Sequence, residues 1–285
     1  MTTASSKASD LAPIQSDAAD AKIPNSFGKL AVARASGRLS WTWPLVFCLI
    51  RFPLLVAGFA VAFWAYHSND SAHAGELAQA FTRYNMPLLA DVVCIGLLMW
   101  RVRREGMTLK DLVRPTRQHL VRDLIRGVLI LAPVACLVGV FNVFYAILSP
   151  SSALQGVGAA SLLNPLGTTW HVAITLLIIP ISSGITEELV YRGYALPRLQ
   201  ALTGRRWLAI GITALGFGLQ HVAFALVDWR LAMIGGISMM MLGAAYGIFY
   251  FAARQRLLPL ILVHWQADFV SLGLAPLLLA LMGVA

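Results

Sequence analysis

After residue 40 the chain alternates between long apolar segments and short segments that carry most of its charge. Seven apolar segments stand out, and they cover residues 43–66, 86–100, 127–148, 166–185, 207–227, 231–253 and 257–285. A helix needs about 20 apolar residues to cross a bilayer. The pattern therefore predicts an all-α, polytopic helical membrane protein with seven transmembrane helices, or eight if the last segment breaks near Gly273 and Pro276.

The first 40 residues follow a different pattern, because they are rich in Ala, Ser and Asp and show almost no apolar periodicity. Such a segment cannot bury enough apolar surface to fold. No apolar run follows the initiator Met, so a signal peptide is not expected. We predict a disordered cytosolic N-terminal tail over residues 1–40 and a transmembrane helical domain over residues 41–285.

Composition and charge agree with a membrane protein. The chain is 58% hydrophobic and 12% charged, whereas a soluble domain is roughly 25% charged. The residues behind its net charge of +9 lie between the apolar segments, so they indicate topology and not a nucleic-acid partner. With the N-terminus in the cytosol, 17 Lys and Arg lie on cytosolic segments, and two, Arg83 and Arg230, lie outside. We therefore expect a lipid bilayer as partner, and the Ala/Arg-rich composition favours a bacterial plasma (inner) membrane.

Ionisable residues inside apolar segments are costly, and they are candidates for function. The set in or beside the apolar segments is Arg51, Asp91, His171, Glu187, Glu188, Arg192, His221, His264 and Asp268. The i,i+4 spacing places two side chains on one helix face. It joins Glu188 to Arg192, Phe217 to His221, and His264 to Asp268. In the last pair the carboxylate can orient the imidazole.

The two adjacent glutamates project about 100° apart on a helix, so we expect them to have different roles. Glu188 faces Arg192 and is expected to pair with it. Glu187 has no local partner, and a weakly solvated carboxylate of this kind suits general base catalysis. The alternative interpretation is a solvated helix end with an ordinary salt bridge.

Two further expectations concern depth in the membrane. Arg51 and Asp91 both lie about 12–14 Å from the cytosolic side at 1.5 Å per residue, and we interpret them as a separate structural pair. Glu187 would be too shallow to meet His221 if its helix ended at Arg192. A single site therefore requires this helix to continue to residue 197 or beyond.

Missing motifs exclude several classes of intramembrane protease. The chain has no HExxH sequence, which marks a zinc protease of the site-2 type. The stretch Ser182-Ser183-Gly184 lacks the leading Gly of the rhomboid GxSG pattern, and no aspartate pair follows the presenilin-type pattern. Glutamates and histidines on three separate segments remain. A proton-coupled transporter is an alternative, but the chain shows no internal repeat.

Three stretches resemble, in order, the EExxxR, FxxxH and HxxxN/D motifs of the CPBP family. This family contains CAAX-prenyl-protease-like and bacteriocin-processing or immunity-type (Abi-type) membrane proteins. The stretches are EELVYRG at 187–193, FGLQH at 217–221 and HWQAD at 264–268. The resemblance covers about residues 166–270. Tyr191 stands where Phe is more usual, and Asp268 stands where Asn is common.

The resemblance implies an intramembrane endopeptidase that acts on a peptide or protein substrate. Glu187 would activate a water, His221 would hold that water or stabilise the oxyanion, and His264 would complete the catalytic site. The supporting residues would be Glu188, Arg192, Phe217 and Asp268. If a metal is bound, as in a metalloprotease, the ion expected is Zn²⁺ and its ligands would be Glu187, His221 and His264. A metal-free mechanism needs the same residues. A non-catalytic scaffold or bacteriocin immunity factor of this family is the alternative.

Overall fold

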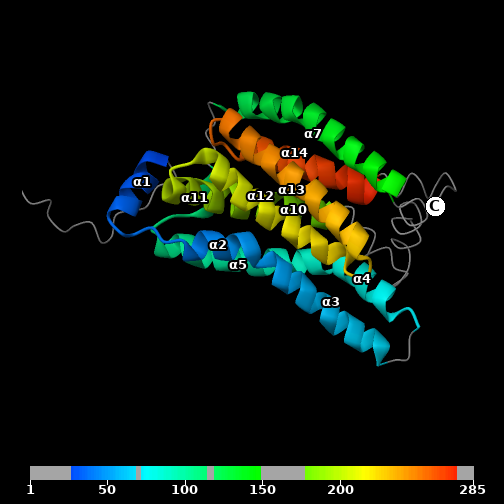
Figure 1. Ribbon diagram of the computed structural model, residues 1–285. Coiled ribbons are helices and arrows are strands. Elements are labelled where there is room, and N and C mark those ends of the chain that lie inside the picture. The colour runs from blue at the N-terminus through cyan, green and yellow to red at the C-terminus, as the bar shows by residue number, and fades with distance from the viewer. Residues whose placement is uncertain (1–26, 69–71, 114–118, 149–176, 275–285) are drawn as a thin grey trace, which may run out of the picture.

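The computed structural model describes residues 27–68, 72–113, 119–148 and 177–274 (Figure 1). Within these residues the regular elements are all helical, which confirms the predicted all-α fold. In chain order they are α1 (Phe27–Ala35), α2 (Thr42–Leu49), α3 (Arg51–His67), α4 (Ala74–Tyr84), α5 (Met86–Arg104), α6 (Leu109–Val113), α7 (Leu120–Leu148), α10 (Ile179–Glu187), η4 (Glu188–Ala195), α11 (Leu196–Thr203), α12 (Arg206–Val222), η5 (Ala223–Ala225), α13 (Trp229–Ala252), α14 (Leu258–Asp268) and η6 (Phe269–Leu274).

Four helices in the described part of the chain are long and apolar enough to cross a membrane. The bent pair α4 and α5 adds a fifth if it crosses as one unit. The four are Thr42–His67, Leu120–Phe141, Arg206–Ala225 and Trp229–Ala252. They agree with a polytopic helical membrane protein, but the expected count of seven or eight is not confirmed. Parts of the segments 166–185 and 257–285, and with them His171, lie outside the described residues.

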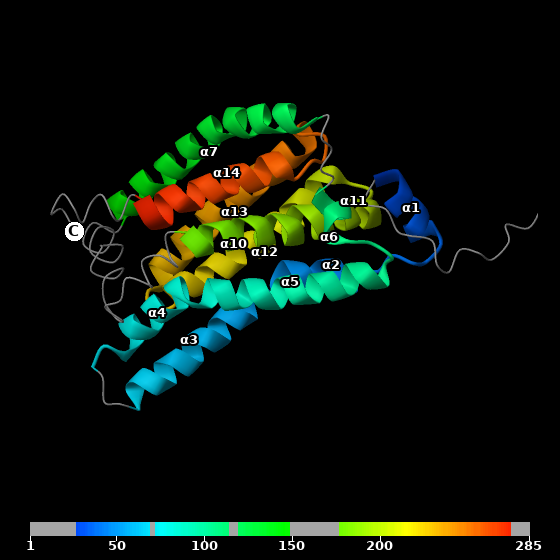
Figure 2. The ribbon, with the colours of Figure 1, turned by 180° about the vertical axis from the view of Figure 1, so that it is seen from behind.

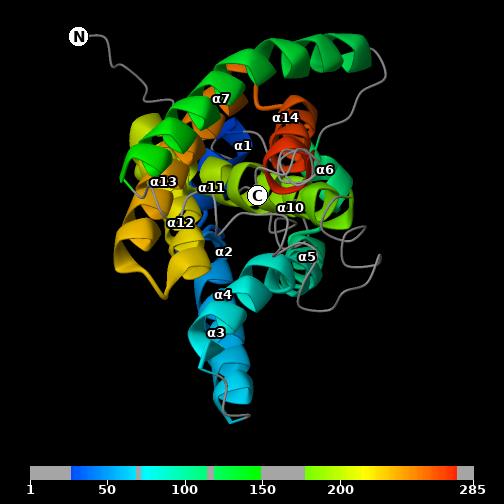
Figure 3. The same cartoon turned by 90° about the vertical axis from the view of Figure 1, so that its right-hand side faces the viewer.

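The segment with the two glutamates forms one continuous helical rod, α10–η4–α11, which runs from Ile179 to Thr203. Viewed from the side of the molecule, this rod lies among the other helices (Figure 3). Its middle part, η4, has π-helical geometry, which is rare and often occurs at functional sites. The rod ends at Gly204, whose φ of +70° forms a left-handed cap that favours glycine. The predicted continuation of this helix past Arg192 is therefore confirmed.

Helices cover the rod on two sides, and the contacts are close. α7 and α14 lie on one side, and α2, α3 and α5 lie on the other (Figures 1 and 2). α10 crosses α14 at Gly184, where a Cβ atom would lie only 2.9 Å from the backbone nitrogen of Trp265. Only a residue without a side chain permits this approach. It brings the rod directly against the helix that carries the third motif.

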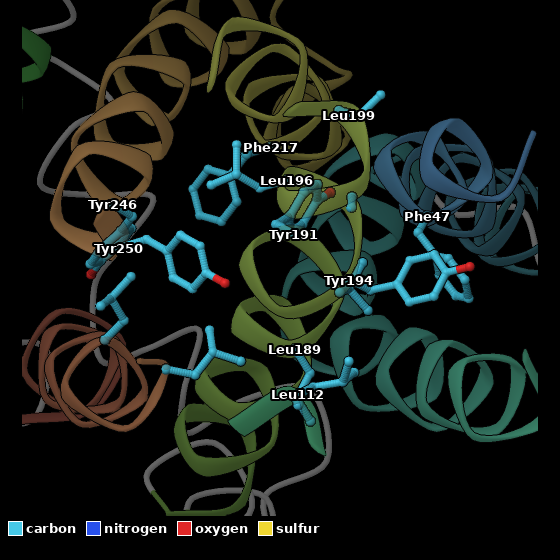
Figure 4. Close-up of a cluster of buried hydrophobic side chains, with 14 of the residues drawn as sticks. Phe47, Leu112, Leu189, Tyr191, Tyr194, Leu196, Leu199, Phe217, Tyr246 and Tyr250 are labelled. Atoms are coloured by element: carbon cyan, nitrogen blue, oxygen red, sulfur yellow. The ribbon is translucent and has the colours of Figure 1, made fainter. Parts of the chain in front are cut away.

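Aromatic side chains fill the core on both sides of the rod. The ring of Tyr191 packs edge-on against Phe217 of α12, with 5.4 Å between centroids. Tyr194 packs against Phe47 of α2 at 4.9 Å. Figure 4 shows Phe217 on one side of the rod and Phe47 on the other. These large buried rings fix how the neighbouring helices sit against the rod.

Several helix ends that carry basic residues are held together at one end of the molecule, on the left in Figure 1. Arg256 pairs with Asp123 at 2.5 Å, which ties the start of α14 to α7. Arg34 donates to a backbone carbonyl of α11. Clustered cations at one end are typical of a cytosolic side. Arg192 and Arg198 are fully buried, however, so these two do not report topology.

Residues 27–35 correct the predicted extent of the N-terminal tail, because they form α1. Leu30 and Ala33 of this helix are buried, and it packs against α11. A nine-residue helix is marginal on its own. Its order therefore depends on that packing, which the local sequence does not reveal.

Candidate active site

The first motif lies in the buried core of the rod. Arg192 Nη1 donates to Glu188 Oε1 at 2.9 Å, and both side chains are fully buried. The predicted i,i+4 pair is therefore confirmed, and the alternative of a solvated helix end is wrong. Arg192 also donates to the Gly243 carbonyl of α13 at 2.9 Å. Its guanidinium lies 4.7 Å from the ring centroid of Phe217 and 5.1 Å from that of Tyr246. The buried cation thus has an anion, a carbonyl and two aromatic faces around it.

The imidazole of His264 lies between the two adjacent glutamates. Its Nδ1 is 2.9 Å from Glu188 Oε1, and its Nε2 is 3.6 Å from Glu187 Oε2. The two acids project in different directions from the rod, yet both reach one ring, because imidazole has nitrogens on opposite edges. With Glu188 ionised, its carboxylate only accepts hydrogen bonds, so Nδ1 is the nitrogen that carries hydrogen.

The Nε2 edge of His264 faces a second carboxylate as well. Asp268 Oδ2 lies 3.6 Å from this nitrogen, as the i,i+4 spacing on α14 predicts. This distance is longer than an ordinary hydrogen bond, and a water beside the two atoms can join them. The side chain of Asp268 is 22% exposed, against 5% for His264. The Nε2 edge is therefore the more accessible edge of the ring.

The second motif meets the third through an aromatic ring. The Phe217 ring centroid lies 4.9 Å from that of His221 and 5.9 Å from that of His264. His221 Nδ1 lies 2.7 Å from the Phe217 carbonyl oxygen. A carbonyl only accepts, so Nδ1 donates and Nε2 is left as the acceptor of the neutral ring. His221 is also near enough to Glu187 for the two to interact electrostatically. The three motifs thus lie together, on three different helices.

Glu187 has a partner that the local sequence does not show. Arg51, the first residue of α3, donates from Nη2 to Glu187 Oε1 at 2.9 Å. The same guanidinium pairs with Asp91 of α5, which confirms the predicted Arg51–Asp91 pair. The expectation that this pair is separate from the site is wrong, because Arg51 also holds Glu187. Arg51 is 136 residues away from Glu187 in the chain, so helical spacing could not connect them.

Three more polar side chains belong to this network, and the motif analysis assigned them no role. Gln220 is fully buried, and its Oε1 accepts from Arg51 Nε at 2.6 Å. The Tyr191 hydroxyl donates to the same oxygen at 3.2 Å. That hydroxyl is what distinguishes Tyr191 from the more usual Phe. Ser183 Oγ donates to Asp91 Oδ2 at 3.1 Å. The one available signal was the buried polar Gln220 inside the FGLQH stretch.

The side chains do not fit the zinc ion that the resemblance allows. In the described part of the chain, no group of three or more His, Cys, Asp and Glu residues is placed to hold a metal ion. Glu187 already contacts the Arg51 guanidinium. A cation next to the carboxylate opposes the binding of a second cation. Side chains and water are therefore the groups available for chemistry at this site.

Comparison with known proteins places the three motifs in one family segment. Residues 169–270 match the family model described as "Type II CAAX prenyl endopeptidase Rce1-like". The match spans all three motifs, and it confirms the resemblance inferred from them. No curated protein and no solved structure matches the chain.

Proposed function

We propose that this chain, whose residues 169–270 match the Rce1-like family model of type II CAAX prenyl endopeptidases, is an intramembrane endopeptidase. One observation carries the proposal beyond the family match. A buried carboxylate oxygen, Glu187 Oε2, lies 3.6 Å from the Nε2 nitrogen of a buried histidine, His264. A water that lies beside this pair can contact both atoms, and it would then meet a general base and a second polar group.

In this proposal Glu187 is the general base. Its Oε1 is held by Arg51, which leaves Oε2 to take a proton from the water. The water oxygen forms a bond to the carbonyl carbon of the scissile peptide, and the carbonyl electrons move to its oxygen. The protonated Glu187 then gives its proton to the leaving nitrogen as the carbon–nitrogen bond breaks. Glu187 thereby returns to the carboxylate form, and protons balance over the cycle.

The two histidines have different tasks in this scheme. His221 orients the water, because its Nε2 is the acceptor nitrogen of the neutral ring. His264 faces the reacting atoms with Nε2, and in this scheme the ring is the doubly protonated imidazolium, so that Nε2–H donates to the oxyanion while Nδ1–H stays on Glu188. Glu188 orients His264 through Nδ1. Asp268 lies beside the same reactive edge and supports the orientation of the ring.

The proposed substrate is a peptide whose scissile bond lies at the membrane. The matched family model is described as a CAAX prenyl endopeptidase, so a prenylated C-terminal CAAX peptide is the first substrate class to test. The clustered basic helix ends support a cytosolic N-terminus, and the composition supports a bacterial inner membrane. A substrate tail would then reach the site from the cytosolic side.

The test uses the purified full chain in detergent with three peptides. They are a farnesylated peptide ending in a CAAX motif, the same peptide without the lipid, and a hydrophobic peptide without the motif. Mass spectrometry should show cleavage of the farnesylated peptide, and the activity should survive dialysis against a chelator. Loss of activity on chelation that added Zn²⁺ restores would contradict the metal-free part of the proposal. No cleavage of any peptide would favour the non-catalytic scaffold.

A further inference from the structure

Arg51 links four helices at a single buried point. It begins α3, directly after the helix is interrupted at Ile50. Its three guanidinium nitrogens contact Asp91 of α5, Glu187 of the rod and Gln220 of α12. Each contact uses a different nitrogen. A planar fork with donors in fixed directions therefore determines where Oε1 of Glu187 lies.

The helical positions of the residues on α10 explain why Glu187 points toward Arg51. Ser183 and Glu187 are four residues apart and share a face, which points toward Arg51 and Asp91. Gly184 and Glu188 share the neighbouring face, which points toward α14. One acid is therefore held mainly by arginine on the α3 side. The other is held by Arg192 and the His264 ring.

Charge balance explains why Arg51 pairs with a second anion, Asp91. If Glu187 takes up a proton during water activation, it no longer neutralises a guanidinium that is 1% exposed. An unpaired charge at such a place is strongly unfavourable. Asp91 is equally buried, and it accepts from both Arg51 and Ser183. Arg51 thus keeps one anion whichever protonation state Glu187 adopts.

We propose that Arg51 is a positioning residue for the base Glu187, and that Asp91 is the fixed counter-ion which keeps Arg51 paired when Glu187 is protonated. The inference rests on the proposed function. All three guanidinium nitrogens of Arg51 contact protein side chains, and the residue is 1% exposed, so we assign it a positioning role and no contact with the substrate. Its loss should therefore reduce kcat and leave KM unchanged.

Arg198 provides a matched control. It is also a fully buried arginine paired with a glutamate, Glu105, but it lies on α11, beyond the end of the first motif. Its replacement should cost thermal stability in the same way as the loss of any buried ion pair. It should not change kcat per folded molecule.

The experiment measures kcat, KM and melting temperature with the farnesylated CAAX peptide. Arg51→Gln should lower kcat about 100-fold, the scale expected for a misplaced catalytic group. Arg51→Lys keeps the charge without the fork and should recover about tenfold of that loss. Asp91→Asn should lower kcat in wild type and have little further effect in Arg51→Gln. Arg198→Gln should leave kcat unchanged. If Arg51→Gln fails to fold, the Arg51→Lys and Asp91→Asn variants carry the test.

The outcomes separate this inference from the proposed function. If wild type cleaves nothing, or if Glu187→Gln cleaves normally, the proposed function fails and the inference falls with it. If wild type cleaves and Arg51→Gln keeps full kcat, only the inference fails. It also fails if Arg198→Gln reduces kcat as much as Arg51→Gln. An infrared difference spectrum between wild type and Glu187→Gln isolates the Glu187 carboxylate band without turnover. The same difference measured in the Arg51→Lys background should show this band shifted. An unshifted band overturns the positioning role.

Discussion

The Nδ1 atom of His264 and the Oε1 atom of Glu188 lie 2.9 Å apart, and Arg192 donates to the same carboxylate oxygen. One oxygen therefore serves a salt bridge inside the rod and a contact between the rod and α14. This makes Glu188 a structural link between the first and third motifs. Glu187 contacts the same ring from its other edge and at a longer distance, as expected for the acid left for chemistry.

The two glutamates should respond differently to the same substitution. Glu188→Gln removes the carboxylate that pairs with the buried Arg192 and should cost about 3–5 kcal/mol of stability. Glu187→Gln leaves Arg51 paired with Asp91 and should cost much less, while it abolishes cleavage. Melting of both variants in detergent measures this. Equal stability losses would contradict the division of roles.

The effect of Glu187→Gln on the melting temperature should change sign when Arg51 and Asp91 are removed. Replacing Arg51 and Asp91 together by Leu leaves Glu187 as a buried anion without its cation. Adding Glu187→Gln to this double variant should therefore raise its melting temperature. The same Glu187→Gln change in wild type should not raise it. If Glu187→Gln lowers the melting temperature in both backgrounds, Arg51 does not hold Glu187 as described.

Gly184 should be sensitive to a single methyl group. A Cβ there would lie 2.9 Å from the Trp265 backbone nitrogen, so Gly184→Ala should push α10 from α14 at a cost of about 1–3 kcal/mol. It should also reduce cleavage, because it separates Glu187 from His264. Gly211→Ala is the matched control, since a Cβ there meets nothing within 4 Å. Comparable losses in melting temperature for both variants would refute the close helix crossing.

Two buried tyrosines offer a matched pair. The Tyr191 hydroxyl donates to Gln220, whereas the Tyr246 hydroxyl has no hydrogen-bond partner in the described part of the chain. Tyr191→Phe should cost about 0.5–1.5 kcal/mol of stability and lower kcat modestly by loosening Gln220. Tyr246→Phe should be neutral or stabilising. Thermal melts and cleavage rates of the two variants test this expectation. A larger loss for Tyr246→Phe than for Tyr191→Phe would argue against the Gln220 contact.

Local spacing was enough to predict part of this site. Glu188 with Arg192 and His264 with Asp268 are each one helical turn apart, so the sequence places them on shared faces. The continuation of the rod past Arg192 also followed, because a single site required that depth. These features depend only on helix geometry and on the cost of charge in hydrocarbon.

Contacts between distant helices could not be predicted in the same way. Arg51 and Glu187 are joined only when α3 packs against the rod, and no periodicity encodes which helices become neighbours. The π-helical stretch in η4 was likewise not visible, since its residues do not differ in composition from an ordinary helix. The need for glycine at residue 184 is explained by the backbone of Trp265 on the facing helix, which the local sequence does not show.

The most direct test of a glutamate-activated water at Glu187 compares cleavage of the farnesylated CAAX peptide by wild type and by Glu187→Gln. Both proteins are first shown to have similar melting temperatures, so that a difference in rate reports chemistry and not folding. Mass spectrometry should show the released C-terminal tripeptide with wild type and none above background with Glu187→Gln. Cleavage by folded Glu187→Gln at the wild-type rate would contradict the assignment of Glu187 as the base.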